Sequence, residues 1–456
     1  MLDLTKGNPF KILIRYILPL FGSIVFQQIY NIADSIIAGK FLGEGALAAV
    51  GNSYEITLIY LSFAFGCNMG ASVVSARLFG AKKYDDMKTA ISTSYIAAIV
   101  TCGVLMIIGF ALSPSLLQLL NTPSEILDDS LTYIYIYTGG LLFLFLYNLT
   151  TGVFAALGDS RTPFVFLVVS SLANIGMDVL FVAEFNMGVA GVAWATFICQ
   201  GASCVAALIA LVIVLRKVKS ERKLKLFSVS ALKEFMLVGV PSALQQCCVS
   251  FGNIAIQGLI NSFGTSTIAG YSAAIKFNNF AVVSIVTVSN GMSNYTAQNL
   301  GADKVYRIKD GVKAALLLAL GIAAIFFVVY MSASSQIMLL FLNPENTEAI
   351  NVGHTFMWIV APFYFVCALK IVPDGVLKGG EKMWQFMIAT MVDLVVRVGL
   401  SFAFAPTFGS MGIWMSWPFG WFLGALCSQI FFFTNKWKLS ARSAQDLEYK
   451  RNTLCE

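Results

Sequence analysis

Long apolar runs separated by short polar loops are the feature that most constrains the fold of this chain. Each run reaches the length of about 20 residues that an α-helix needs to cross the hydrocarbon core of a bilayer. Of the 456 residues, 58% are hydrophobic and only 12% are charged, against about 25% charged residues in a typical soluble domain. The pattern therefore predicts an all-α polytopic membrane protein. About twelve spans are expected, approximately at 12–39, 46–78, 89–112, 131–157, 163–185, 189–215, 232–260, 267–299, 310–332, 350–377, 384–405 and 409–434.

The loops between these spans alternate in charge. One set is basic and includes the run RKVKSERKLK from Arg216, both tails and the loops around Lys82, Arg161, Lys304 and Lys378. The opposite set is acidic and holds a single base, Lys40. Cytoplasmic loops carry an excess of lysine and arginine. The sequence therefore predicts a multi-pass protein of the cytoplasmic (inner or plasma) membrane with both termini in the cytoplasm, and no affinity for nucleic acid.

The first apolar run is too long for a cleavable signal peptide, and no small-residue cleavage site follows it. We therefore interpret it as the first span.

Two halves of the chain repeat each other. SARLFGAKKYDDMK from Ser75 matches TAQNLGADKVYRIK from Thr296, and Gly80 matches Gly301 at a shift of 221 (301 − 80). Each half holds an even number of spans, so the copies share one orientation and are related by an axis along the membrane normal, with a cleft between them. The predicted fold is two pseudo-symmetric six-helix bundles. The predicted domains are an N-terminal lobe (1–215), a basic cytoplasmic linker (216–230), a C-terminal lobe (231–435) and a cytoplasmic tail (436–456).

Two acidic residues inside the N-terminal lobe, Asp34 and Asp178, have no basic residue within a helical turn. Asn174 is four residues before Asp178 on the same helix face, and the predicted topology brings Thr196 of the sixth span to the same depth. Two carboxylates, an amide oxygen and a hydroxyl suit a hard cation, and two close carboxylates raise each other's proton affinity. This set predicts a coupling site for Na⁺ or H⁺, with no other cofactor or metal. The alternative is that both acids are protonated packing elements.

Charged residues of the C-terminal half have local partners. Lys370 and Asp374 are four apart on one helix, as are Asp393 and Arg397. Such residues face each other, so each pair is expected to neutralise itself.

A substrate cavity and a bend are also predicted. The residues expected to line the cavity are Gln27, Tyr30, Asn31, Glu55, Met69, Lys276 and Phe280. Pro19 removes a backbone hydrogen bond and permits a bend in the first span that could be coupled to Asp34. A static kink is the alternative, because Pro241 repeats Pro19 whereas Ile256 stands at the place that matches Asp34.

At this point the sequence resembles the multidrug and toxic compound extrusion (MATE) family. The resemblance rests on PLFGSIVFQQIYNIADSIIAG, GDSRTPFVFLVVSSLANIGMD and GVAGVAWAT, and it covers nearly the whole chain. It implies a MATE/MOP-type fold, alternating access and export of drugs or toxins against Na⁺ or H⁺. In one branch of the family the ion ligands map onto Asp34, Asn174, Asp178 and Thr196. Another branch uses acids in the seventh and tenth spans, where this chain has Ser250 and Cys367.

The favoured function is therefore a secondary antiporter, a monomer in the lipid bilayer that exports small amphipathic, often cationic compounds. The alternative is a lipid-linked oligosaccharide flippase of the same superfamily, which would need several unpaired arginines in its cavity. An ion channel would need a repeated filter that this chain lacks. We expect no enzyme, because His354 is the only histidine and no phosphate-binding loop is present.

Glu55 and Lys276 occupy equivalent places in the two halves (55 + 221 = 276), and we hypothesise that they approach each other across the cleft when its outer mouth is shut. Single charge reversals at either position should then lower transport, and the double reversal should restore it because the pair is re-formed. Transport by proteoliposomes measures this. A double reversal without recovery would mean that each residue simply faces water.

Overall fold

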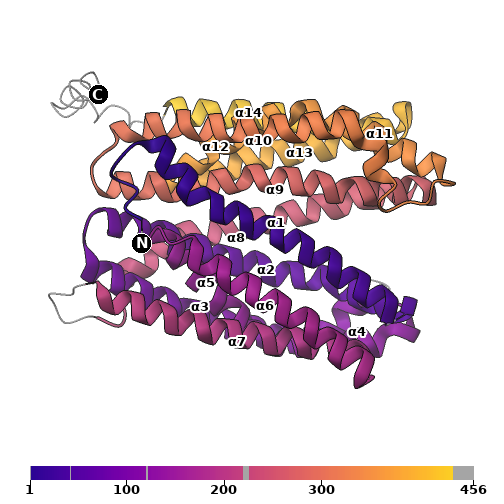
Figure 1. Cartoon of the computed structure of the whole chain (residues 1–456), viewed down its shortest axis with the longest axis horizontal. Coiled ribbons are helices and arrows are strands. Elements are labelled where there is room, and N and C mark those ends of the chain that lie inside the picture. The colour runs from indigo at the N-terminus through magenta and orange to yellow at the C-terminus, as the bar shows by residue number, and fades with distance from the viewer. Residues whose placement is uncertain (1, 42, 120–121, 219–224, 435–456) are drawn as a thin grey trace. The chain divides into compact units, whose positions relative to one another are not determined.

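The structure is a computed structural model, which describes residues 2–41, 43–119, 122–218 and 225–434 (Figure 1). Side chains at 28–48, 50–52, 54, 55 and 119 lie outside this description. The described residues form helices and no strands. In the first half the helices are α1 (Pro9–Phe41), α2 (Gly43–Gly80), α3 (Tyr84–Leu119), α4 (Ser124–Gly139), α5 (Leu141–Ala156), α6 (Arg161–Val179), η1 (Leu180–Glu184) and α7 (Gly188–Lys217). In the second half they are α8 (Val229–Asn261), α9 (Thr265–Gly301), α10 (Tyr306–Met338), α11 (Thr347–Val360), η2 (Ala361–Phe363), α12 (Tyr364–Gly379), α13 (Met383–Phe408) and α14 (Ser410–Thr434).

Every predicted span falls on one of these helices or on a helix pair. Ten described helical stretches are long and apolar enough to cross a membrane. The pair α4 and α5, bent by 49° at its break, would be an eleventh span. The twelfth predicted span coincides with α14, which has 25 residues and no charged side chain. The all-α, multi-pass fold expected from the apolar runs is confirmed.

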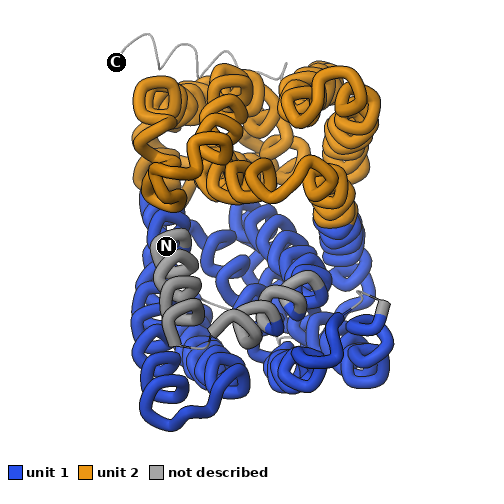
Figure 2. Tube along the Cα trace, turned by 90° about the vertical axis from the view of Figure 1, so that its right-hand side faces the viewer, with its two compact units in different colours: residues 1–2, 18–247 blue, residues 3–17, 248–456 orange. Residues whose placement is uncertain are grey.

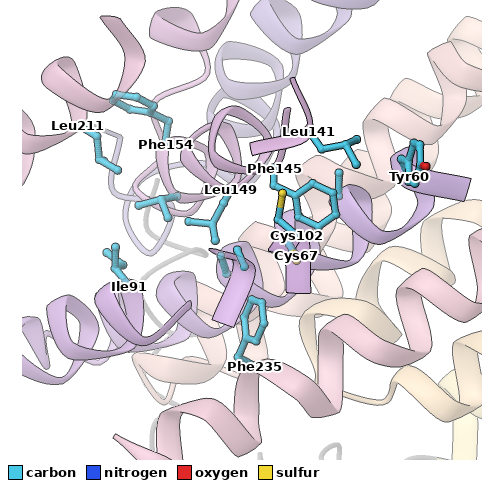
Figure 3. Close-up of a cluster of buried hydrophobic side chains, with 14 of the residues drawn as sticks. Tyr60, Cys67, Ile91, Cys102, Leu141, Phe145, Leu149, Phe154, Leu211 and Phe235 are labelled. Carbon is cyan, nitrogen blue, oxygen red and sulfur yellow. The ribbon is translucent and has the colours of Figure 1, made fainter. Parts of the chain in front are cut away.

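The described chain divides into two compact units (Figure 2). The first unit comprises residues 1–2 and 18–247, and the second comprises 3–17 and 248–456. Within the first unit, α2 packs against α3, α4 and α5. Figure 3 shows the apolar core at this junction, with Tyr60, Cys67, Phe145 and Leu149 among its buried side chains.

In the second unit, α9 and α12 occupy the places that α2 and α5 have in the first. A glycine pair on α12 permits their close contact. A Cβ atom at Gly375 would lie 2.5 Å from the Ser289 carbonyl oxygen, and one at Gly379 would meet the Ser293 carbonyl oxygen. Small residues at such contacts let the helix backbones approach, which is how helices commonly associate in membranes.

The N-terminal segment Asp3–Ile17 belongs to the second unit, although the rest of α1 belongs to the first. The Leu4 N–H donates to Gln298 Oε1 at 3.0 Å, and Arg307 Nη2 donates to the Gly7 carbonyl at 2.7 Å. The division between the units therefore falls just before Pro19. Helix α1 runs through this proline, and the Ser23 hydroxyl donates to the Pro19 carbonyl at 3.0 Å. The predicted bend at Pro19 stays a prediction, as do the proposed lobe boundaries.

The internal repeat is visible in the turns that end α2 and α9. Lys82 and Asp303, 221 positions apart, both have φ of 57°. The next residues close the same hydrogen bond, from Lys83 N–H to the Leu78 carbonyl at 3.0 Å and from Lys304 N–H to the Asn299 carbonyl at 2.8 Å. A left-handed residue followed by this bond is a common way to terminate an α-helix. At this turn the two halves therefore repeat in backbone geometry as well as in sequence.

Truncation of a core aromatic side chain tests the packing of the first unit. Phe145 is fully buried, so Phe145→Ala should lower the free energy of unfolding by about 3–5 kcal/mol, through lost apolar burial and a new cavity. Denaturant titration in mixed detergent micelles measures the loss. Val169→Ala, at a side chain that is 61% exposed, is the matched control and should change stability little. An equal loss in both variants would contradict this description of the core.

Candidate functional site

Helix α6 begins at a well-defined cap. The Asp159 carboxylate accepts hydrogen bonds from the Thr162 N–H at 3.1 Å and from the Thr162 hydroxyl at 2.8 Å. A carboxylate at this end satisfies a free backbone donor and interacts favourably with the helix dipole. The sequence signal DSRTP thus starts the helix.

The buried face of α6 is polar. The buried residues of this helix are Ser171, Asn174 and Asp178, with exposed fractions of 5%, 4% and 1%. They are three and four positions apart, so they lie on one stripe along the helix. Apolar side chains such as Val165 and Leu172 are exposed instead. A helix of a soluble protein shows the opposite arrangement. An acid placed inward within a membrane span is a marker of an ion or proton pathway.

The helix changes its winding directly after Asp178. Residues Leu180–Glu184 form a short π-helix, in which Phe185 N–H donates to the Leu180 carbonyl at 3.1 Å. Such π-turns carry an extra residue and occur often at functional sites. Gly191 then allows α7 to return closely, because a Cβ there would lie 3.2 Å from Phe181 Cβ. The polar stripe therefore ends beside a tight hairpin.

Thr196, the predicted ligand from the sixth span, is half-buried on α7. It lines a small cavity of about 40 Å³ together with Tyr137, Gly140, Phe197 and Gln200. This cavity lies at the bend between α4 and α5, and α7 also packs directly against α6. Its lining is mostly apolar, with Tyr137, Thr196 and Gln200 as the polar side chains, and its volume is enough for one water.

The structure brings Asn174 and Asp178 together on one buried face, as predicted. Residue 34 lies within helix α1, but the side chain of Asp34 is outside the described part of the structure, as are those of Tyr30, Asn31 and Glu55. The convergence of Asp34 and Thr196 with the α6 pair stays a prediction. Ser171 was not identified from the sequence, although its position three residues before Asn174 was a signal that could have found it.

The described cavity candidates occupy different environments. Gln27 is exposed, whereas Met69 is buried within the first unit. In the second unit, Lys276 is exposed and its ammonium lies 5.1 Å from the centre of the Phe341 ring. Phe280 packs edge-on against Phe326 at 5.2 Å. Their role in substrate binding stays a prediction.

Contrary to the prediction from the sequence, the charged residues of α12 and α13 do not all pair within their own helix. The predicted Lys370–Asp374 pair is present, with Nζ 3.1 Å from Oδ2. The predicted Asp393–Arg397 pair is wrong, because Asp393 Oδ2 instead lies 3.6 Å from Lys370 Nζ on the neighbouring helix. The Arg397 guanidinium instead lies 4.5 Å from the centre of a Trp417 ring and donates to Asn253 Oδ1.

A family model described as MatE matches residues 19–180 and 241–403. The chain belongs to the MatE family. Members of this family are membrane transporters and not enzymes. The two matched segments repeat one model within the chain, in agreement with the internal repeat.

Relatives of this MatE protein span nearly its whole length. It is 27% identical over 448 residues to the "Probable multidrug resistance protein YpnP" of Bacillus subtilis, with 96% of this chain and 97% of that protein covered. It is 24% identical to the "Multidrug export protein MepA" of Staphylococcus aureus, with 72% of each covered.

Solved structures show the same fold. "Crystal structure of MATE in complex with MaL6" superposes with a TM-score of 0.90 at 21% identity, covering 97% of this chain and 99% of that one. "Outward-facing conformation of a multidrug resistance MATE family transporter of the MOP superfamily" has a TM-score of 0.89 at 21% identity, covering 96% and 98%.

Proposed function

We propose that this protein is a multidrug efflux antiporter, which exports small amphipathic and often cationic compounds in exchange for Na⁺ or H⁺ by alternating access. The observation that carries the proposal is the stripe Ser171, Asn174 and Asp178, the buried face of α6. Burying a carboxylate costs several kcal/mol unless a cation or a proton compensates it. A site that needs such compensation can couple the conformation of the protein to an ion gradient.

The geometry of α1 supports a contribution from Asp34. A Cβ at Gly22 would lie 3.6 Å from the Phe164 ring, so α1 and α6 meet near that level. At 1.5 Å per residue, position 34 lies about 18 Å beyond Gly22, and Asn174 and Asp178 lie about 15 and 21 Å beyond Phe164. The predicted topology runs both helices outward, which would bring Asp34 to the level of the α6 pair.

The names of the relatives, which describe multidrug resistance and export proteins, support the substrate class. Aromatic side chains around Lys276 and Phe280 offer adaptable apolar contacts for amphipathic compounds. We further propose that the protein functions as a monomer in the cytoplasmic membrane. Both termini lie in the cytoplasm in this proposal, since the basic loops are on the same side of the membrane as the termini. The coupling ion is its only cofactor, and nucleic acid is not a partner.

Transport by purified protein in liposomes tests this function. An imposed Na⁺ or H⁺ gradient should drive the uptake or release of fluorescent cationic dyes, and dissipation of the gradient with an ionophore should stop it. If neither gradient moved any dye and a polyprenyl-linked lipid crossed the bilayer, the lipid flippase would be the correct function.

Removal of the buried charge on α6 tests the coupling site. Asp178→Asn keeps the shape of the side chain but no longer gains or loses a charge, so gradient-driven transport should fall roughly tenfold or more, because only differential ion binding can shift the conformations. Initial rates of dye transport measure the effect.

Ser170→Ala is the matched control, since its hydroxyl only donates to the Leu167 carbonyl of the same helix at 3.1 Å. This variant should transport at nearly the native rate. An Asp34→Asn, Asp178→Asn double variant that kept the native rate would refute the assignment of both acids.

A further inference from the structure

The second unit contains a buried cluster of four charged side chains. Lys370 and Asp374 come from α12, and Asp393 and Arg397 come from α13. All four residues are buried. The Lys370 ammonium contacts both acids, at 3.1 Å from Asp374 Oδ2 and 3.6 Å from Asp393 Oδ2. Two positive and two negative charges make the cluster neutral in total.

Helix α14 is shaped to accommodate this cluster. A Cβ at Gly420 would lie 2.7 Å from Asp393 Oδ1, and a Cβ at Gly424 would lie 2.7 Å from Lys370 Cε. The Ser428 hydroxyl donates to the remaining oxygen of Asp374. Buried ion pairs are stable only when their geometry is good and further hydrogen bonds satisfy the ions. The serine supplies such a bond to Asp374, and the glycines leave room for Asp393 and Lys370, whereas Asp393 Oδ1 has no hydrogen-bond partner among the described residues. The Lys370 ammonium is therefore the main compensation for both acids.

The internal repeat relates α13 to the polar stripe of α6. Gly158 and Glu381, which precede these helices, have positive φ of 73° and 58° and are 223 positions apart (381 − 158). At the same shift, Asp159 N–H bonds to the Phe154 carbonyl and Lys382 N–H bonds to the Leu377 carbonyl. Asn174 then corresponds to Arg397, and Asp178 to Ser401 (401 − 178 = 223). All four residues are buried, so the register is consistent.

The second unit therefore has the guanidinium of Arg397 at the position where the first has the amide of Asn174. The turns at Gly188 and Gly409, with φ of 58° and 61°, set a shift of 221 for the following helices, at which Thr196 corresponds to Trp417. The Arg397 guanidinium lies 4.5 Å from the centre of a Trp417 ring and donates to Asn253 Oδ1 at 3.3 Å. The place that matches the candidate ion site is thus filled by an arginine.

We propose that Lys370 is a tethered counter-ion, which holds the place of a small monovalent cation between Asp374 and Asp393. With Arg397 it balances the charges of Asp374 and Asp393 without any ion from solution. The second unit consequently takes up no transported ion, and removal of the lysine amine creates a monovalent-cation site there. This inference concerns the second unit alone and does not depend on the coupling site proposed for the first.

The test uses the full-length protein in the Asp178→Asn background, where the candidate site of the first unit lacks one of its two acids. Lys370→Ala leaves two buried carboxylates against one guanidinium, so the protein should gain about one monovalent cation. Binding of radioactive Na⁺ and proton uptake by a pH indicator measure the two possible occupants. The carboxyls of Asp374 and Asp393 are the groups that would take up the proton. Lys378, buried one turn after Asp374 on α12, is the other titratable side chain beside them. A Na⁺ or a proton gained only after removal of the lysine supports the proposal.

A charge-balanced variant is the matched control. Lys370→Met, Asp393→Asn removes one charge of each sign and should gain neither Na⁺ nor a proton. Lys370→Met alone keeps the side-chain volume, and it replaces Lys370→Ala if that variant does not fold. Two results would overturn the proposal. One is a folded single variant that gains neither ion. The other is Na⁺ binding by the Asp178→Asn protein that Asp374→Asn abolishes, because the second unit would then already bind an ion.

Discussion

The free-energy cost of placing charge and unsatisfied polar groups in an apolar medium governs this structure. The same cost makes the chain helical, because a helix satisfies its own backbone donors and acceptors inside a bilayer. It also makes every buried ionisable side chain informative. In the first unit the buried acid of α6 is Asp178, which lies with Asn174 and Ser171 on the buried face of this helix. A helix whose apolar side chains face outward and whose polar side chains face inward is suited to bind an ion within the membrane.

The two units share a backbone design but treat buried charge in different ways. Equivalent turns, with left-handed residues at Lys82 and Asp303, end equivalent helices. On α6 and α13, the fifth predicted span of each half, however, Asn174 and Asp178 correspond to Arg397 and Ser401. The second unit has basic side chains for its acids, with Lys370 between Asp374 and Asp393. A duplicated fold can in this way retain the geometry of an ion site in both halves while only one half exchanges ions with solution. That difference would give the proposed antiporter an asymmetric coupling mechanism within a symmetric scaffold.

Much of the fold could be predicted from the sequence, because the length of the apolar runs and the internal repeat follow directly from the order of residues along the chain. The span expected at 163–185 became α6 and η1, and the span at 131–157 became the bent pair α4 and α5. The pairing of Asp393 could not be predicted in the same way. Helix periodicity put Arg397 one turn away, but the helix rotation set by packing brought the carboxylate to Lys370 on another helix. Ser171 was missed for a related reason, since Ser170 and Ser171 lie four and three residues before Asn174 and only burial distinguishes the two serines.

The sequence by itself determined the helical, membrane-spanning class of this protein, its duplication and the presence of two acids with no basic residue within a helical turn, because each depends on composition or on spacing along the chain. Tertiary structure alone decided which faces are buried and which partner each charge finds. In the structure, Asp178 lies on the buried polar stripe of α6. Asp393 contacts Lys370 of α12 rather than Arg397 of its own helix, and Arg397 stacks on the Trp417 ring. The physical reason is that burial and ion pairing depend on the rotation and closeness of separate helices. Those are set by side-chain packing, at contacts such as Gly420 and Gly424, between residues far apart in the chain.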